Sequence, residues 1–404
     1  MSSASPSGPS EKRRFTQPAL RTAYLPFSPP MVGEEEIAEV VDTLRSGWIS
    51  TGPKTKRFES EFATYVGTDA ALALASCTAG LHLALAALGV GPGDEVITTP
   101  YTFCSTANVI EHVGATTVLA DVQPDTLNID PAAVDAAITA RTKAIVAVHL
   151  AGHPADLDEI HSAAEPHEIA VVQDAAHSLP ALYRGRRIGS DTDLTAFSFY
   201  ATKNLTTAEG GMLTGASDLV EQARVLSLHG MNRDAWQRYA RSGSWFYEVV
   251  SPGYKYNMTD IQASLGVWQL RKLEGFQRRR HQVAAAYTEA FSQHECFEVP
   301  TVRSYVTTAW HLYVLRLRTS ALTIDRAQFI QELAARNIGT SVHFIPIHVH
   351  PYYSGKYHWS PHDFPIAFDS YERAISLPLH PGLSDADVAD VVHAVIDVAD
   401  KHTR

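Results

Sequence analysis

The chain has 404 residues, of which 45% are hydrophobic and 19% charged, a composition typical of a soluble globular protein of roughly two to three domains. Acidic residues outnumber basic ones by 44 to 33, and the net charge of −11 disfavours wholesale binding to nucleic acid or to an anionic membrane. No apolar run reaches the roughly 18–20 residues of a membrane span. The three cysteines lack metal-ligand spacing, which favours a reducing, cytoplasmic compartment.

Strand and helix patterns alternate along most of the chain, after a stretch at 1–24 whose Ser, Pro and Arg content predicts a disordered tail. We expect helices at 33–46, 54–66, 81–88, 131–140 and 157–167, and strands at 70–75, 95–98, 117–121, 144–149, 170–173 and 194–199. Strands separated by single helices imply right-handed crossovers. The pattern therefore predicts an α/β domain at 25–260, with a mostly parallel sheet between helices.

The pattern changes beyond Asn257. Residues 259–291 predict one long helix, or two helices with a bend at Gly275. Further strands are expected at 311–317, 339–343 and 375–379, and further helices at 325–336 and 384–401. Residues 261–404 are therefore predicted to form a smaller α+β domain.

Lys203 stands apart from the other charged residues. It follows the apolar segment 194–199, and no charged residue comes after it until Glu209. Lysine usually lies on a solvated face among other charges, and an ordinary surface lysine is the alternative here. Poor hydration lowers the pKa of lysine because burial disfavours the charged form, and the neutral amine attacks aldehydes. The setting suits a Schiff-base lysine.

Several side chains fall where expected strands end, at the edge of the sheet where α/β proteins bind ligands. They are Thr78, Phe103, Asp174 and Ser198. The small residues at 76–80 would leave helix N–H groups accessible to a phosphate, although an ordinary capped turn is the alternative. Asp174 could likewise be a helix cap. Beside a pyridine nitrogen, it would hold a proton on that nitrogen, and an aspartate paired with a Schiff-base lysine is typical of pyridoxal phosphate chemistry.

Seven segments in order resemble the DegT/StrS-type sugar aminotransferases, which are fold-type I pyridoxal phosphate enzymes that aminate keto sugars attached to nucleotides. The segments are SGWISTGP (46–53), SCTAG (76–80), PYTF (100–103), QDAAH (173–177), FSFYATK (197–203), EGG (209–211) and GYKYNMTDI (253–261). The resemblance runs from about residue 25 to the C-terminus. The segment 253–261 is most similar to the subgroup that aminates C4 of UDP-4-keto pentoses and related sugars.

The resemblance implies pyridoxal 5'-phosphate as cofactor and assigns roles around its ring. Lys203 would form the Schiff base and shuttle the proton, and Asp174 would pair with the pyridinium nitrogen. Phe103 would stack on the ring. His177 would reach the ring hydroxyl, a position at which relatives often have glutamine.

The phosphate would be held by backbone amides of Thr78 and Ala79 and by the hydroxyl of Ser198. Asn257 would reach the phosphate of the neighbouring subunit, which implies a homodimer with composite active sites. Residues expected near the substrate are Trp48, Tyr200 and His348. No metal site is expected, because the histidines at 343, 348 and 350 have no carboxylate or cysteine beside them.

The implied reaction moves an amino group from glutamate to the keto sugar of a nucleotide-sugar, at C4 of a UDP- or dTDP-linked sugar. Three alternatives stay open. One is transamination of a non-sugar ketone such as a cyclitol. Another is a same-fold dehydratase, a branch that replaces the lysine with histidine, and the third is a non-catalytic regulatory homologue, which predicts decay of the cofactor residues.

Overall fold

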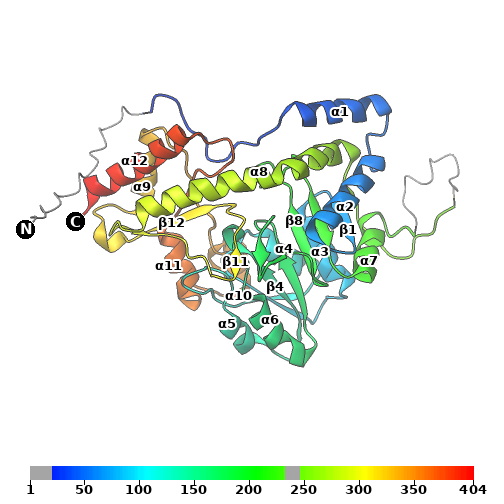
Figure 1. Ribbon diagram of the computed structural model, residues 1–404. Helices are drawn as coiled ribbons and strands as arrows, with labels where there is room; N and C mark the ends of the chain where they lie inside the picture. Colours follow the sequence, from blue (N-terminus) through cyan, green and yellow to red (C-terminus); the bar gives the residue numbers. More distant parts are fainter. Residues whose placement is uncertain (1–20, 233–245) are drawn as a thin grey trace, which may run out of the picture.

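The computed structural model describes residues 21–232 and 246–404 (Figure 1). A seven-stranded sheet with strand order β1-β9-β8-β5-β4-β2-β3 forms its centre. The strands are β1 (Ala71–Leu74), β2 (Glu95–Thr98), β3 (Thr116–Leu119), β4 (Thr142–Val148), β5 (Ala170–Asp174), β8 (Leu194–Ser198) and β9 (Gly211–Thr214). From β3 to β8 neighbouring strands pair in parallel, whereas β9 is antiparallel to both β8 and β1. The prediction of a mostly parallel sheet is confirmed.

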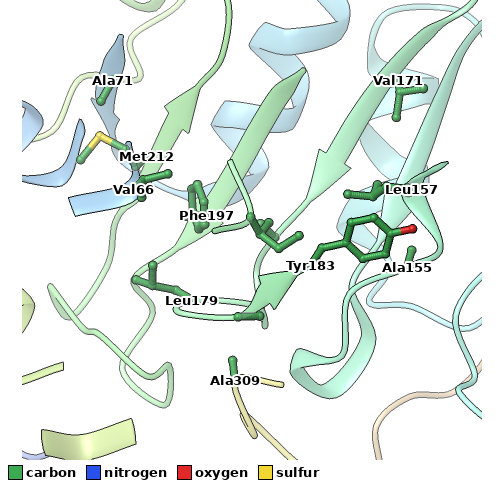
Figure 2. Packing of buried hydrophobic residues seen from close by; sticks show 14 of the residues in the cluster. Val66, Ala71, Ala155, Leu157, Val171, Leu179, Tyr183, Phe197, Met212 and Ala309 are labelled. Atoms are coloured by element: carbon green, nitrogen blue, oxygen red, sulfur yellow. The ribbon is translucent and has the colours of Figure 1, made fainter. Parts of the chain in front are cut away.

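Helices cover both faces of this sheet, because successive side chains of a strand point to opposite sides. Ala71 and Phe197 pack in one cluster, part of which Figure 2 shows, while Leu72 and Ala196 pack in another. The first cluster includes residues of α2 (Pro53–Val66), α5 (Pro131–Ala137), α6 (Leu157–Ala164) and α8 (Asp260–Phe291). The second includes residues of α3 (Cys77–Ala87), α4 (Ser105–His112) and α7 (Ser217–Ser227). Each fully buried leucine or phenylalanine stabilises the fold by about 1.5–3 kcal/mol.

The C-terminal part is built on a separate cluster that includes the last turns of α8. Its antiparallel sheet has the order β10-β12-β13, and the helices α9 and α12 contribute residues to the same hydrophobic cluster. The bounds are β10 (Phe297–Glu298), β12 (Tyr313–Leu317), β13 (Ala374–Leu377), α9 (Arg326–Ala335) and α12 (Asp385–His402). The remaining elements are α1 (Glu34–Ser46), α10 (Pro351–Tyr357), α11 (Pro365–Arg373), β6 (Leu182–Tyr183), β7 (Arg186–Arg187) and β11 (Val306–Thr307).

Helix α8 crosses the whole molecule and joins the two parts (Figure 1). It is one helix of 32 residues that begins at a capping box made by Thr259 and Gln262, and the exposed Gly275 does not interrupt it. Its first half packs in the first cluster, which contains Phe197, and its last turns pack in the C-terminal cluster. The predicted division after residue 260 therefore falls at the start of a shared helix, and it stays a prediction.

Some expectations differ from the structure, and the helix expected at 131–140 already ends at Ala137. Residues 339–343 form no strand. The backbone N–H of Gly339 bonds to Leu25 and that of Ser341 bonds to Ser376, so the segment pairs with two different parts of the chain. Helix α6 ends at Ala164, where a 3-10 turn containing Pro166 follows. Of the predicted tail, residues 1–20 lie outside the described residues. Arg21 donates to Asp387 and Asp390 of α12 at 2.6 and 2.9 Å.

Within the described ranges, each helix is too short or too polar to cross a membrane.

Candidate active site

A cavity of about 480 Å³ lies where the parallel strands end. Thr78 lines it from the first turn of α3, Phe103 from the segment after β2, and Asp174 and Ser198 from the ends of β5 and β8. His177, Tyr200 and Lys203 line the same cavity. The structure thus brings together seven of the residues that the sequence singled out, from segments far apart in the chain.

Lys203 lies in the loop between the antiparallel strands β8 and β9. Backbone hydrogen bonds from Lys203 to Tyr200 and from Thr207 to Phe199, both 2.9 Å, fix the loop, and Leu205 anchors it in the core. Burial lowers the pKa of Lys203 to about 8, although the neighbouring acidic groups of Cys77 and Asp174 act in the opposite direction. The amine is therefore neutral more often than an ordinary lysine at neutral pH, as a nucleophile or proton acceptor must be.

Asp174 lies at the base of the cavity and is 4% exposed. Its Oδ2 accepts a 2.8 Å hydrogen bond from the Thr106 hydroxyl, and its Oδ1 accepts one of 3.1 Å from the Ala176 N–H. Burial raises the pKa of Asp174, while these bonds and the charge of Lys203 oppose the rise. A buried carboxylate of this kind is stabilised by a cationic partner in contact with it.

The start of helix α3 forms another wall. Ser76 caps the helix by accepting a 3.1 Å bond from the Ala79 N–H. Ala79 itself is not among the residues that line the cavity, whereas Ser76, Cys77 and Thr78 are. Gly211 permits this wall, because a Cβ there would lie 2.5 Å from the carbonyl carbon of Ser76 and 2.6 Å from the nitrogen of Cys77. The positive end of the α3 dipole therefore borders the cavity.

Aromatic and imidazole rings form the rest of the lining. Phe103 is 57% exposed, and its ring centroid lies 5.8 Å from that of Phe344. His177 Nδ1 accepts a 3.3 Å bond from the Ala151 N–H. Burial, with a smaller effect of Lys203, lowers the pKa of His177 well below its usual value. The ring is therefore neutral and carries its hydrogen on Nε2, as a donor.

Besides Ala79, three predicted residues lie outside the cavity lining. Asn257 donates to the Thr51 hydroxyl at 2.6 Å, close to the loop that carries Trp48. His348 is fully buried, and its ring lies 5.0 Å from that of Phe364 and 6.3 Å from that of Phe368. Within this chain, therefore, Asn257, Trp48 and His348 are not brought to Lys203.

Sequence reasoning missed four residues of the site, namely Thr106, His311, His343 and Phe344. The last three come from the C-terminal part and reach the cavity through tertiary packing. His311 starts an apolar strand pattern, and a polar residue at that point is the one signal that could have drawn attention to it. In the described part of the chain, no three His, Cys, Asp or Glu side chains are grouped so that they could hold a metal ion.

Comparisons with known proteins show the family of this chain. Residues 30–396 match the DegT/DnrJ/EryC1/StrS aminotransferase family. The spore coat polysaccharide biosynthesis protein SpsC of Bacillus subtilis is 53% identical over 380 residues, which cover 94% of this chain and 98% of SpsC. The uncharacterized protein MJ1066 of Methanocaldococcus jannaschii is 52% identical over 377 residues, covering 93% of this chain and 98% of that protein.

The solved structure of the putative sugar aminotransferase Spr1654 from Streptococcus pneumoniae, in its PMP form, superposes with a TM-score of 0.88 at 39% identity. It covers 93% of this chain and 99% of that one. A PLP form of the same protein superposes with a TM-score of 0.87.

The cavity described above fits that cofactor. The buried carboxylate of Asp174 can pair with a pyridinium nitrogen, and the amine of Lys203, with its lowered pKa, can react with an aldehyde. The start of helix α3, next to which Gly211 has no side chain, can bind a phosphate. The chain belongs to the DegT/DnrJ/EryC1/StrS aminotransferase family and is a pyridoxal phosphate-dependent aminotransferase.

Proposed function

We propose that this enzyme transfers the amino group of glutamate to C4 of a UDP- or dTDP-linked 4-keto sugar. The names of its relatives support a sugar acceptor, since SpsC is a polysaccharide biosynthesis protein and Spr1654 a putative sugar aminotransferase. The observation that carries the chemistry is the amine of Lys203, with its pKa lowered to about 8, in one cavity with the buried Asp174. The product would be an amino sugar for polysaccharide or natural-product biosynthesis.

Lys203 and Asp174 have the central roles in this proposal. When bound, pyridoxal phosphate supplies an electron sink that allows a carbon–hydrogen bond next to nitrogen to break. Nζ of Lys203, in its neutral form, accepts the proton that leaves that carbon. It then moves the proton between the substrate carbon and the cofactor. The carboxylate of Asp174 keeps a proton on the ring nitrogen, because a nearby negative charge favours the protonated form.

Other residues bind and orient. Phe103 stacks against the ring, and the Nε2–H of His177 donates toward the ring hydroxyl. Thr78 and Ser198 hold the phosphate at the start of α3. Ala79 joins them if the phosphate displaces the Ser76 hydroxyl from its amide.

We also propose that the site is completed by a second copy of the chain. Of the described residues that line the cavity, Lys203 alone is a lysine or arginine, although the donor and a nucleotide-sugar carry several negative charges. The apolar side chains of Ile49, in the loop whose Thr51 bonds to Asn257, and of Val249 and Val250, earlier in the segment that leads to Asn257, are 52–62% exposed, as expected of a surface covered in a dimer. Asn257 would then reach the partner's phosphate.

The substrate residues stay predictions. Tyr200, which is 47% exposed and lines the cavity, would contact the sugar. Trp48 would act across the dimer interface, close to Asn257. His348 would require Phe364 and its neighbours to move before it met a substrate, because its ring is enclosed. The cytoplasmic location also stays a prediction.

The experiment that tests the proposal is an absorbance spectrum of the purified holoenzyme before and after glutamate, followed by keto-sugar acceptors. We expect glutamate to convert the cofactor band to that of pyridoxamine phosphate, and Lys203→Ala to abolish the conversion. A UDP- or dTDP-4-keto sugar should then restore the original band with release of an amino sugar. Restoration by a 3-keto sugar or a cyclitol ketone, and not by any 4-keto sugar, would reject the proposed acceptor.

A further inference from the structure

His311 contacts the amine of Lys203 from the C-terminal part of the chain. Its Nε2 lies 3.5 Å from Nζ of Lys203, and its ring lines the cavity. It precedes strand β12, and its ring centroid is 4.4 Å from that of His177. The imidazole therefore shares the wall of the cavity with the lysine and is 6% exposed.

Asn204 determines which nitrogen of His311 carries the hydrogen. Its Nδ2 donates two hydrogen bonds, to the carbonyl oxygens of Leu179 at 3.0 Å and Ala309 at 2.8 Å. These two acceptors orient the amide, so its Oδ1 is the atom that faces His311 Nδ1, at 3.2 Å. An oxygen there can accept but not donate, so Nδ1 holds the hydrogen and Nε2 presents a lone pair to Lys203.

The backbone at His311 is held from two sides. The buried guanidinium of Arg280 donates to the carbonyl oxygens of Trp310 and His311, at 3.2 and 3.4 Å. Gly152 packs against the other side, since a Cβ at Gly152 would lie 2.9 Å from the nitrogen of Trp310 and 3.0 Å from that of His311. The His311 N–H itself donates to the Ala151 carbonyl at 3.0 Å. The ring therefore has little freedom to move away from Lys203.

The charges around this pair favour a neutral imidazole. Burial lowers the pKa of His311 well below its usual value, and Lys203, His177, Arg280 and His343 act in the same direction. The groups that act on Lys203 are Cys77 and Asp174, which raise its pKa, and the surrounding burial, which lowers it. A neutral histidine thus faces an amine that changes protonation near pH 8.

We propose that His311 is a positioning residue for Lys203, whose unprotonated Nε2 accepts one hydrogen of the lysine amino group whenever that group is not bonded to the cofactor. This inference rests on the proposed role of Lys203. With one N–H directed to His311, the lone pair of the neutral amine is left for the substrate side of the cavity. The contact holds the amine where proton exchange needs it, and such placement matters because a shift of about 1 Å in a reacting group can cost about 10²-fold in rate.

Two substitutions at the same position separate this role from simple packing. The amide of His311→Asn ends as far along the side chain as Nδ1, so it can meet Asn204 but leaves no atom for Lys203. The amide of His311→Gln ends one bond further, as Nε2 does, and can offer its oxygen to Lys203. The matched control is His149→Asn. His149 is a fully buried histidine outside the cavity lining, whose Nδ1 and Nε2 bond to Ala155 and Gln173 at 3.0 and 3.1 Å.

The activity measurement is a single turnover of the pyridoxamine phosphate enzyme with 2-oxoglutarate, followed by absorbance. We expect His311→Asn to lower the maximal rate constant by about 10²-fold while half-saturation changes less than about threefold, because the contact concerns the amine and not substrate binding. His311→Gln should recover most of the loss, and His149→Asn should leave the rate within about threefold. Equal rates for the Asn and Gln variants would overturn the proposal.

A second measurement is independent of activity. In the pyridoxamine phosphate form of the full chain, labelled with ¹⁵N at histidine, the His311 signals are identified by their loss in His311→Gln. We expect a hydrogen on Nδ1 and an unprotonated Nε2 from pH 6 to 9. A hydrogen on Nε2 would overturn the inference. Failure of wild-type enzyme to react with glutamate, with the expected tautomer present, would instead reject the proposed role of Lys203.

Discussion

The Thr106 hydroxyl donates a 2.8 Å hydrogen bond to Oδ2 of Asp174, so helix α4 supports the carboxylate at the end of strand β5. Thr106 is itself held by a 2.9 Å hydrogen bond with the hydroxyl of Thr102. The carboxylate, which its proposed role requires in ionised form, is buried, and burial alone raises its pKa. The hydroxyl of Thr106 is thus one of the groups that keep Asp174 ready to bind a cation.

Replacing Thr106 with valine tests this support. Thr106→Val keeps the shape but removes a donor to a charged group, which is worth about 1.5–3 kcal/mol. We expect the pKa of Asp174 to rise further and the Kd of pyridoxal phosphate to increase about tenfold to 100-fold in fluorescence titrations. Thr98→Val is the control, since its hydroxyl donates to the neutral carbonyl of Val146 at 2.9 Å. The explanation is wrong if both variants bind the cofactor equally well.

The pKa of Lys203 predicts a pH profile for the reaction of the pyridoxamine phosphate enzyme with 2-oxoglutarate. Below pH 8 the amine carries a proton and cannot accept another, so the rate constant should rise roughly tenfold per pH unit and level off above about pH 8. An ordinary lysine would place the plateau above pH 10. Stopped-flow measurements at saturating keto acid would check this, and a flat profile between pH 6.5 and 9 would contradict it.

The proposed composite site predicts complementation between two inactive variants. We expect Lys203→Ala and Asn257→Ala to lower activity separately by about 10²-fold or more. In a mixed dimer, one site would combine the intact Lys203 of one subunit with the intact Asn257 of the other. Mixing under conditions that exchange subunits should therefore restore up to about a quarter of the wild-type activity. If no activity is recovered although mass spectrometry verifies subunit exchange, Asn257 does not act in the partner's active site.

The close packing of Gly211 against the start of helix α3 predicts that a side chain at this position would be destabilising. A Cβ in Gly211→Ala would meet backbone atoms of Ser76 and Cys77, which cannot rotate away. We expect a loss of about 1–3 kcal/mol in stability together with weaker cofactor binding. Gly275→Ala is the opposite case, because a Cβ there meets a single atom, Nη2 of the flexible Arg278, at 3.7 Å. It should stabilise α8 by up to about 1 kcal/mol in urea unfolding.

The part of the site that the sequence predicted is the part that parallel topology brings together. Thr78 and Phe103 follow strands and Asp174 and Ser198 end them, and such strand ends meet at one edge of the sheet. His311 and its neighbours could not be placed in this way. Their positions depend on how the C-terminal part packs, which no local pattern records.

Local competition explains the other differences. Ala79 was expected to offer its amide to a phosphate, but the Ser76 hydroxyl caps that amide. His348 was expected near the substrate, and the structure encloses its ring beside Phe364. The strand expected at 339–343 failed because its backbone groups pair with two different segments. For the strand, contacts distant in sequence outweighed the local pattern, while the roles of Ala79 and His348 stay predictions.

The shared helix α8 limits how the cavity can open. At 1.5 Å per residue its 32 residues span about 48 Å, and it is stiff over that length. At its start, the buried Asp260 accepts hydrogen bonds of 2.7 Å from the Gly52 N–H and the Thr55 hydroxyl. A swing of the C-terminal part about residue 260 would have to break these bonds. Opening of the cavity by such a swing is therefore disfavoured, and we expect heat to unfold both clusters in a single cooperative transition.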